Sequence, residues 1–419
     1  MKARTIFGLL LPLLGAPAAA QTSISVAHSR VRAALDAVKA DSAWTLDQQI
    51  SICEIAAPPF KEQTRAAEFR RRLESLGLRD VKIDAVGNVI AERPGTGMGP
   101  SVMLAGHLDT VFPEGTDVKV KRVGARLASP GIGDDCRGLA VILTVARAFQ
   151  TANIQTTGTV YFVGDVGEEG AGNLRGVRHL FEKELKGKID YFISADGPGH
   201  ELTIRAVGSH RYRIIYKGPG GHSYTAFGTV NPIHALGRAI AAIAEVRVPS
   251  SPKTTFSVGT TTGGTSVNSI PFEASAELDM RSESAEELAR LDLKVRAILR
   301  AALDAENARW GGGKAGKPKL TLQVDTIGIR PASGSQTERS PIVATAIAAA
   351  KTLGFTATVV ASSTDANLPM SMGIPAITIE VGGRGGGAHS LSEWYEDTGD
   401  PARGPQWALL LVSALAGVK

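Results

Sequence analysis

Cysteine is scarce in this chain of 419 residues, which contains only Cys53 and Cys136. Their spacing fits neither a zinc finger nor a redox motif. In an oxidising compartment the two could pair, or they could stay as buried thiols, which we favour. Long apolar runs are also missing: no stretch is apolar and free of charge over the roughly 20 residues that a transmembrane helix needs. We therefore expect neither a cysteine-based zinc module nor a membrane span.

An excess of one charge is missing too. The formal net charge is only +5, and basic residues cluster locally, as in Arg70-Arg71-Arg72 on a predicted helix, where a solvated face explains them. The run "GGRGGG" lacks the Lys-Ser/Thr that a P-loop requires. We expect no nucleic-acid partner and no phosphate loop.

The N-terminus has the pattern of an export signal. Lys2 and Arg4 precede an apolar stretch of about ten residues, and the small residues Ala18-Ala19-Ala20 follow it. We predict a signal peptide over residues 1–20 and a mature protein that starts near Gln21 in a secreted or periplasmic compartment.

The remaining chain predicts two domains, because its length exceeds what one core usually holds. Residues 21–208 and 331–419 alternate between strand and helix patterns, which indicates an α/β fold whose sheet has a mostly parallel centre and flanking helices. Residues 209–330 have the order β-α-β-β-α-β of a ferredoxin-like α+β unit. We expect this unit to be inserted into the α/β domain.

Acidic and imidazole side chains follow or flank the predicted strands and helices of the α/β domain. Because ligand sites in such sheets lie at the carboxyl ends of the strands, we expect these side chains to gather at one edge. The segments are "GHLDTV" with His107 and Asp109, "GIGDDCRG" with Asp134 and Asp135, "GDVGEEGAG" with Glu168 and Glu169, "ISADGPG" with Asp196, and "GGGAHSLSEW" with His389.

The number of ligands suggests two metal ions that share Asp134. One ion would take His107, Asp134 and Asp196, and the other Asp134, Glu169 and His389. Each ion then has three protein ligands and an open position, as in catalytic zinc sites. Imidazole and carboxylate ligands without thiolate suit two zinc ions, with cobalt or manganese as substitutes.

Asp109 and Glu168 are not assigned as metal ligands. His107 and Asp109 share one face of extended backbone, so the Asp109 carboxylate is expected to hold the second ring nitrogen of His107. Glu168 diverges from its neighbour Glu169 and is expected to take a proton from a water between the metals, as a general base.

The motifs "GHLDTV", "GDDCRG", "GEEG", "SADG" and "GGGAHS" resemble, in order, those of the dizinc aminoacylase/carboxypeptidase superfamily. This superfamily includes peptidase T, glutamate carboxypeptidase and the acetylornithine and succinyl-diaminopimelate deacylases. The resemblance runs from about Leu46 to the C-terminus. It implies Asp134 as the bridging ligand, hydrolysis of an amide bond in a small peptide or N-acyl amino acid, and a homodimer formed through the inserted domain.

The resemblance also gives roles to three residues of the insert. It implies that His222 in "GPGGHSYTAFG" reaches the oxyanion in the partner subunit's site, and that Asn268 and Arg330 hold the substrate carboxylate. The chain departs from the family pattern at Cys136, where many members carry lysine, and at "SSTDAN", where Gly-Gly commonly precedes Thr364-Asp365. These departures concern substrate preference.

Three functions stay open at this point. The leading one is an exported aminopeptidase or di- or tripeptidase, because Asp196 stands where the deacylases and carboxypeptidases of the superfamily usually carry glutamate. The second is an N-acyl-amino-acid deacylase or glutamate-carboxypeptidase-type amidohydrolase on the same fold. The third, a non-catalytic binding protein, predicts lost ligands, and the expected ligands are all present.

Overall fold

The computed structural model describes residues 26–314, 316–397 and 399–419. The predicted signal peptide, residues 1–20, lies outside these ranges. Within them, none of the helices combines the length and the apolar character needed to cross a bilayer.

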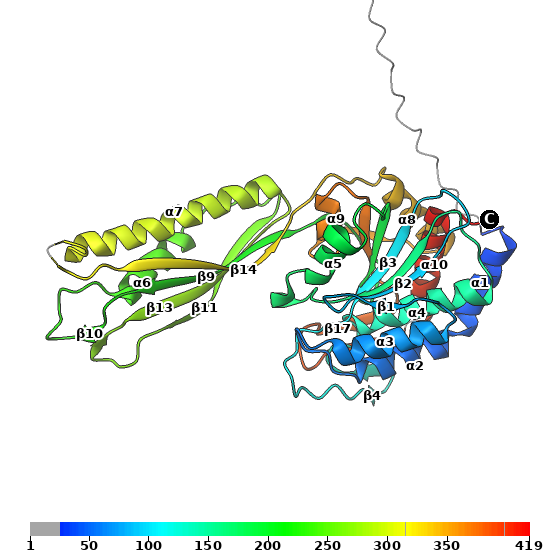
Figure 1. Cartoon of the computed structure of the whole chain (residues 1–419), viewed down its shortest axis with the longest axis horizontal. Coiled ribbons are helices and arrows are strands. Elements are labelled where there is room, and N and C mark those ends of the chain that lie inside the picture. Colours follow the sequence, from blue (N-terminus) through cyan, green and yellow to red (C-terminus); the bar gives the residue numbers. More distant parts are fainter. Residues whose placement is uncertain (1–25, 315, 398) are drawn as a thin grey trace, which may run out of the picture.

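The larger part of the molecule, on the right in Figure 1, is built on an eight-stranded sheet. Its strands are β1 (Lys82–Ile83), β2 (Val89–Arg93), β3 (Val102–His107), β6 (Val160–Asp165), β7 (Tyr191–Ala195), β8 (Glu201–Ala206), β15 (Thr358–Ser362) and β16 (Ala376–Ile379). Their order is β1-β2-β6-β3-β7-β16-β8-β15. The four central strands β6, β3, β7 and β16 run parallel. This confirms the predicted α/β class with a mostly parallel centre.

Helices cover both faces of this sheet. One face packs against α1 (Ser29–Ala40), α2 (Ser42–Cys53), α3 (Gln63–Ser75), α4 (Cys136–Thr151), α8 (Pro341–Thr352) and α10 (Arg403–Ala416). The other packs against α5 (Arg175–His179), the π-helical turn Leu180–Glu184 and α9 (Asn367–Ser371). Successive residues of β3 enter the two cores in turn: Leu104 lies in the first, and Met103 and Ala105 lie in the second. Burial on both faces explains why this strand is a continuous apolar run.

A small sheet that the sequence analysis did not anticipate lies beside the main one. Its strands, in the order β17-β18-β5-β4, are β4 (Lys121–Val123), β5 (Arg126–Ala128), β17 (Arg384–Gly386) and β18 (Trp394–Glu396). Each has only three residues, too few for an alternating pattern to be recognised. The β17–β18 hairpin matters because its loop carries His389.

The smaller part, on the left in Figure 1, is a four-stranded antiparallel sheet covered on one face by two helices. It contains β9 (Gly208–Lys217), β10 (Gly221–His222), α6 (Pro232–Ala244), β11 (Thr254–Gly263), β12 (Ser269–Ile270), β13 (Glu273–Ser282), α7 (Ala285–Trp310) and β14 (Thr321–Arg330). The sheet order is β11-β13-β9-β14, and β10 pairs with β12 separately. A hydrophobic core of its own joins the sheet to both helices. We propose that this unit is the inserted domain expected over residues 209–330.

Both helices of this smaller part begin after residues that favour the N-terminus of a helix. Asn231 accepts a hydrogen bond from the backbone N–H of Ile233 at 2.9 Å, and Pro232 occupies the first turn of α6. Ser284 caps α7 in the same way, and Gly311 ends α7 in the left-handed conformation, at a φ of 67°.

Candidate metal centre and active site

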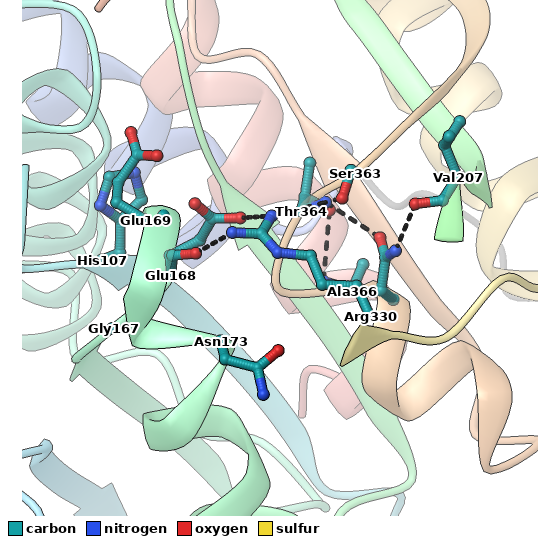
Figure 2. A network of polar contacts seen from close by, with 12 residues as sticks. His107, Gly167, Glu168, Glu169, Asn173, Val207, Arg330, Ser363, Thr364 and Ala366 are labelled. Carbon is teal, nitrogen blue, oxygen red and sulfur yellow. Dashed lines mark hydrogen bonds and ion pairs between the residues drawn. The ribbon is translucent and has the colours of Figure 1, made fainter. Parts of the chain in front are cut away.

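The predicted ligands meet at the carboxyl edge of the main sheet. His107 is the last residue of β3, and Asp196 directly follows β7. Glu169 lies in the loop after β6, Asp134 precedes α4, and His389 reaches in from the β17–β18 hairpin. Figure 2 shows His107, Glu168 and Glu169 near one another at this edge. The sheet therefore assembles residues that are up to 282 positions apart in the chain.

The ligand atoms form two groups that share Asp134. In the first, atoms of His107, Asp134 and Asp196 lie within 4.8 Å of one another; in the second, those of Asp134, Glu169 and His389 do. Both groups match the predicted ligand sets. A further combination, His107 with Glu168 and Glu169, satisfies the same distance limit.

The two carboxylate oxygens of Asp134 point to different histidines. Oδ1 lies 2.9 Å from Nε2 of His107, and Oδ2 lies 3.1 Å from Nε2 of His389. Nε2 of His389 also lies 2.9 Å from Oε1 of Glu169. An aspartate placed in this way can supply one oxygen to each of two ions.

The pKa values of Asp196 and His389 are shifted toward protonation. Burial, together with the neighbouring charge of Asp134, raises the pKa of Asp196 well above its usual value. Hydrogen bonds to Asp134 and Glu169 raise the pKa of His389 to about 10. Metal ions bind to the deprotonated forms of these ligands, so a bound cation would displace the protons of Asp196 and His389. Buried carboxylates and imidazoles without thiolate are a donor set that fits zinc, cobalt or manganese.

Asp109 is buried beside His107, and its backbone carbonyl oxygen lies closer to the imidazole than its carboxylate does. Nδ1 of His107 lies 3.0 Å from the backbone carbonyl oxygen of Asp109 and 3.9 Å from its carboxylate. The carboxylate instead accepts hydrogen bonds from the backbone N–H groups of Gly167 (2.7 Å), Glu168 (3.2 Å) and Glu169 (2.9 Å). The three backbone N–H groups are buried and need an acceptor, which the Asp109 carboxylate provides. The backbone carbonyl oxygen of Asp109 is in place to orient the His107 ring. Asp109 therefore supports both His107 and the loop that carries the two glutamates.

Two other acids hold the segment around Asp134. Asp135 caps α4 by accepting from the N–H of Gly138 at 2.9 Å, and it also accepts from the N–H of His107 at 3.1 Å. Glu393 accepts from the N–H groups of Gly131, Gly133 and Asp134 at 2.7, 2.8 and 3.0 Å. The sequence analysis missed Glu393, although it lies four residues after His389 in the quoted segment.

Glu168, the predicted base, is paired with Arg330, the predicted substrate-binding arginine. Nη1 of Arg330 donates to Oε1 of Glu168 at 2.7 Å, and Nη2 donates to the Glu168 carbonyl oxygen. Nη1 also contacts Oγ of Ser363 at 3.3 Å. Figure 2 shows the guanidinium directed at Glu168. Both side chains are buried, at 6% and 7% exposure, so in this conformation Arg330 already has an anionic partner.

The other two predicted residues, His222 and Asn268, are not brought to this edge within one chain. His222 belongs to β10, which Figure 1 places at the end of the insert remote from the main sheet. It pairs with Ser269, the neighbour of Asn268, so the two predicted residues lie close to each other. Both are exposed.

A cleft of about 690 Å³ opens onto the candidate metal centre. Its walls come from both parts of the molecule: the edge that holds the candidate ligands with Glu168 and Arg330, residues 362–364 at the end of β15, and the face of the insert sheet that is opposite to its helices. A cleft of this size admits a small organic substrate.

Cys53 and Cys136 are buried free thiols. Sγ of Cys53 lies 3.6 Å from the carbonyl oxygen of Pro130, and burial raises the pKa of Cys136 well above its usual value. Neither thiol is among the candidate metal ligands, and an elevated pKa disfavours the reactive thiolate.

Residues 103–409 match the family model described as peptidase family M20/M25/M40. The chain belongs to this family. The predicted superfamily is thereby confirmed, and so is the predicted enzyme class, because M20 enzymes are metal-dependent hydrolases.

Solved M20 structures share the fold. The aminopeptidase PepT from Bacillus cereus superposes with a TM-score of 0.71 at 22% identity, covering 90% of this chain and 99% of PepT. YXEP from Bacillus subtilis, described as a dinuclear metal-binding peptidase, has a TM-score of 0.66 at 18% identity, with 91% and 100% covered.

A succinyl-diaminopimelate desuccinylase from Burkholderia mallei is 30% identical over 252 residues, covering 54% of this chain and 66% of the relative. The chain spans about half the length of the curated relatives that it matches, between 43% and 66% for the first three.

Proposed function

We propose that this M20 protein hydrolyses amide bonds of small peptides, as an aminopeptidase or a di- or tripeptidase that uses two zinc ions. The observation that carries this proposal is the position of Asp134 between two groups of ligand atoms. His107 and Asp196 would complete the site of one ion, and Glu169 and His389 the site of the other. Cobalt or manganese could replace zinc at these ligands.

Bound at these ligands, the cations would polarise the amide carbonyl and make the attacking water more acidic. Glu168 borders the cleft and would accept a proton from that water, then deliver it to the nitrogen that leaves when the C–N bond breaks. Arg330 fixes the position of the Glu168 carboxylate through Oε1. Asp109 and Glu393 keep the two ligand-bearing loops in place by accepting six backbone N–H groups between them.

We also propose a homodimer formed through the insert, in which His222 and Asn268 serve the site of the partner subunit. β11 is an edge strand of the insert sheet, and an unpaired edge can add another strand. Large apolar side chains near His222 are exposed, namely Tyr224 (85%), Phe227 (78%), Val267 (102%) and Phe272 (61%). Such a group of side chains is typical of an interaction surface.

The substrate carboxylate would contact Arg330 and the partner's copy of Asn268. Because Arg330 already holds Glu168, substrate binding would have to share or replace that contact. The N-terminal pattern supports export to a secreted or periplasmic compartment as a further part of the proposal.

A second candidate is an N-acyl-amino-acid deacylase or a glutamate-carboxypeptidase-type amidohydrolase. It is favoured by the similarity to proteins named succinyl-diaminopimelate desuccinylase. Asp196, at a position where deacylases of the superfamily usually carry glutamate, favours the peptidase.

One substrate screen separates the two candidates. The purified protein, loaded in turn with zinc, cobalt and manganese, is assayed on di- and tripeptides and on N-acetyl and N-succinyl amino acids. We expect hydrolysis of free peptides and at most slow release of acyl groups. Efficient deacylation without peptide hydrolysis would replace the first function by the second, and inertness toward both classes would contradict the proposed function.

A further inference from the structure

The larger part of the molecule and the insert are joined by two crossings of the chain. The first crossing is Val207, between β8 and β9, and the second is Pro331, directly after β14. The crossings lie side by side, because Ala206 and Ser333 exchange both backbone hydrogen bonds, at 2.8 and 3.1 Å. The positions of these two crossings determine how the insert is held over the cleft.

One side chain of the larger part contacts both crossings. Asn367, the first residue of α9, is fully buried. Its Nδ2 donates to the carbonyl oxygen of Val207 at 2.8 Å and to that of Pro331 at 3.0 Å. Its Oδ1 accepts from the backbone N–H of Thr364 at 2.9 Å. Figure 2 shows Val207, Thr364 and Arg330 around this network. Both hydrogens and the oxygen of the Asn367 amide are thus used.

The second crossing continues directly into the arginine that holds the proposed base. Arg330 precedes Pro331, and its Nη1 donates to Oε1 of Glu168 at 2.7 Å. The end of β14 is also tied to the loop after β6, because the N–H of Ile329 donates to Oδ1 of Asn173 at 2.8 Å. Since Arg330 and Pro331 share a rigid peptide unit, a shift of Pro331 would move Arg330 relative to Glu168.

The backbone segments at the crossings are packed closely. A Cβ atom at Gly208 would lie only 2.5 Å from the backbone nitrogen of Ala332, and the N–H of Val207 donates to the carbonyl oxygen of Ser362 at 2.8 Å. Dense packing of this kind transmits strain, so a change at the Asn367 amide would reach the neighbouring segments.

We propose that Asn367 is a positioning residue that fixes both crossings and, through Pro331, holds Arg330 in place against Glu168. The role toward Arg330 rests on the proposed function, in which Glu168 is the base, whereas the role at the crossings does not. Because the walls of the cleft come from both parts of the molecule, the same contacts fix the distance between these walls.

Asn367→Asp is the decisive variant. It keeps the shape of the side chain and the acceptor for Thr364, but it replaces the NH₂ group with an oxygen that faces the carbonyl oxygens of Val207 and Pro331. Asn367→Ala removes the same contacts without adding a charge, and it decides if Asn367→Asp does not fold.

The first measurement is the distance between spin labels on Arg32→Cys in α1 and Lys294→Cys in α7, two exposed positions of the larger part and the insert. The native thiols Cys53 and Cys136 are buried and should stay unlabelled. An excess of unlabelled chains keeps distances between subunits out of the measurement. The distance distribution should be broader or displaced in both Asn367 variants than in the protein with Asn367 intact.

The second measurement is kcat/KM on the best substrate of the screen above. Asn367→Asp should retain its metal ions and lose about 10- to 100-fold in kcat/KM, as expected when a group at the reacting centre is misplaced by about 1 Å. In an Arg330→Gln background the same substitution should add at most about a twofold loss, because residues that act through one contact are not additive.

Asn307→Asp is the matched control. Asn307 is also buried, and its amide accepts from the N–H of Leu320 at 2.9 Å and donates to the carbonyl oxygen of Leu320 at 3.2 Å, within the insert. Asn307→Asp and Asn367→Asp should both lower Tm, but only Asn367→Asp should change the label distances and kcat/KM.

Three results would overturn the inference. Unchanged label distances in folded Asn367→Asp and Asn367→Ala refute the role at the crossings. Changed distances with wild-type kcat/KM refute the role toward Arg330, and so does a full additional loss in the Arg330→Gln background. If the wild-type protein hydrolyses none of the substrates, the proposed function fails together with the role toward Arg330, while the label distances still decide whether Asn367 fixes the crossings.

Discussion

Replacing Asp109 with asparagine should loosen the metal centre without touching a metal ligand. The Asp109 carboxylate is fully buried, and it accepts three backbone N–H groups from the loop that carries Glu168 and Glu169. Oδ1 takes two of these donors and Oδ2 takes the third, that of Glu169. Asparagine has the same shape but only one oxygen acceptor.

The size of the effect follows from this geometry. In the better orientation the asparagine oxygen serves Gly167 and Glu168, and its NH₂ group then faces the N–H of Glu169 across 2.9 Å. One buried donor loses its acceptor, which costs about 1–3 kcal/mol of folding free energy. Because Glu169 is a proposed ligand, displacement of its backbone should also weaken metal binding by about 10- to 100-fold, as for other residues that orient ligands.

Metal titration and thermal unfolding measure these effects, and Asp84→Asn provides a matched control. Oδ1 of Asp84 accepts three backbone N–H groups, from Val86, Gly87 and Asn88 at 2.9–3.0 Å, in a turn between β1 and β2. Its Oδ2 accepts from the side-chain amide of Asn88 at 2.7 Å, so asparagine leaves one donor without an acceptor here as well. Both variants should lower Tm, and only Asp109→Asn should weaken metal binding. Equal metal affinity in wild-type protein and Asp109→Asn would refute the supporting role of this carboxylate.

Two further predictions concern the dimer and the pH dependence of stability. If His222 acts across the subunit interface, mixing His222→Ala protein with Glu168→Ala protein should restore part of the activity, because one site of each heterodimer is intact. Verified heterodimers without activity would argue against this role. Burial raises the pKa of Glu380 from 4.5 to about 7, so its neutral form stabilises the fold fully below about pH 4.5, and this contribution is lost as the pH rises through about 7. Glu380→Gln cannot ionise and should therefore show a smaller decrease in Tm over this pH range than the wild type; identical Tm profiles would contradict the assignment.

The features that could be predicted from the sequence are those encoded by local patterns. The buried run that forms β3 and the long amphipathic pattern that forms α7 each identify their element without tertiary information. Three of the five proposed ligands, His107, Glu169 and Asp196, follow from motifs at or after the ends of β3, β6 and β7, because the topology of a parallel sheet places these ends at one edge. The other two, Asp134 and His389, precede α4 and lie on the β17–β18 hairpin.

The contacts that were missed depend on directions that the sequence does not encode. Glu393 reaches the Asp134 segment only because the β17–β18 hairpin folds over it, and strands of three residues leave no periodic signal. The H-x-D spacing brings Asp109 next to His107, but the backbone N–H groups of the loop after β6 bind the Asp109 carboxylate, so its carbonyl oxygen lies nearer to the imidazole. The Glu168–Arg330 pair joins two parts of the fold, so local sequence patterns cannot predict it either.

The central claim is that Glu169 binds metal while its neighbour Glu168 transfers the proton, and metal content measured together with turnover tests it most directly. Glu168→Gln should retain two metal ions per chain and bind substrate, while kcat falls by about 100-fold or more, the usual contribution of a positioned base. Glu169→Ala should lose one ion and the activity with it. A depleted Glu168→Gln beside a fully loaded Glu169→Ala would reverse the two roles, and near-normal turnover in Glu168→Gln would contradict the mechanism.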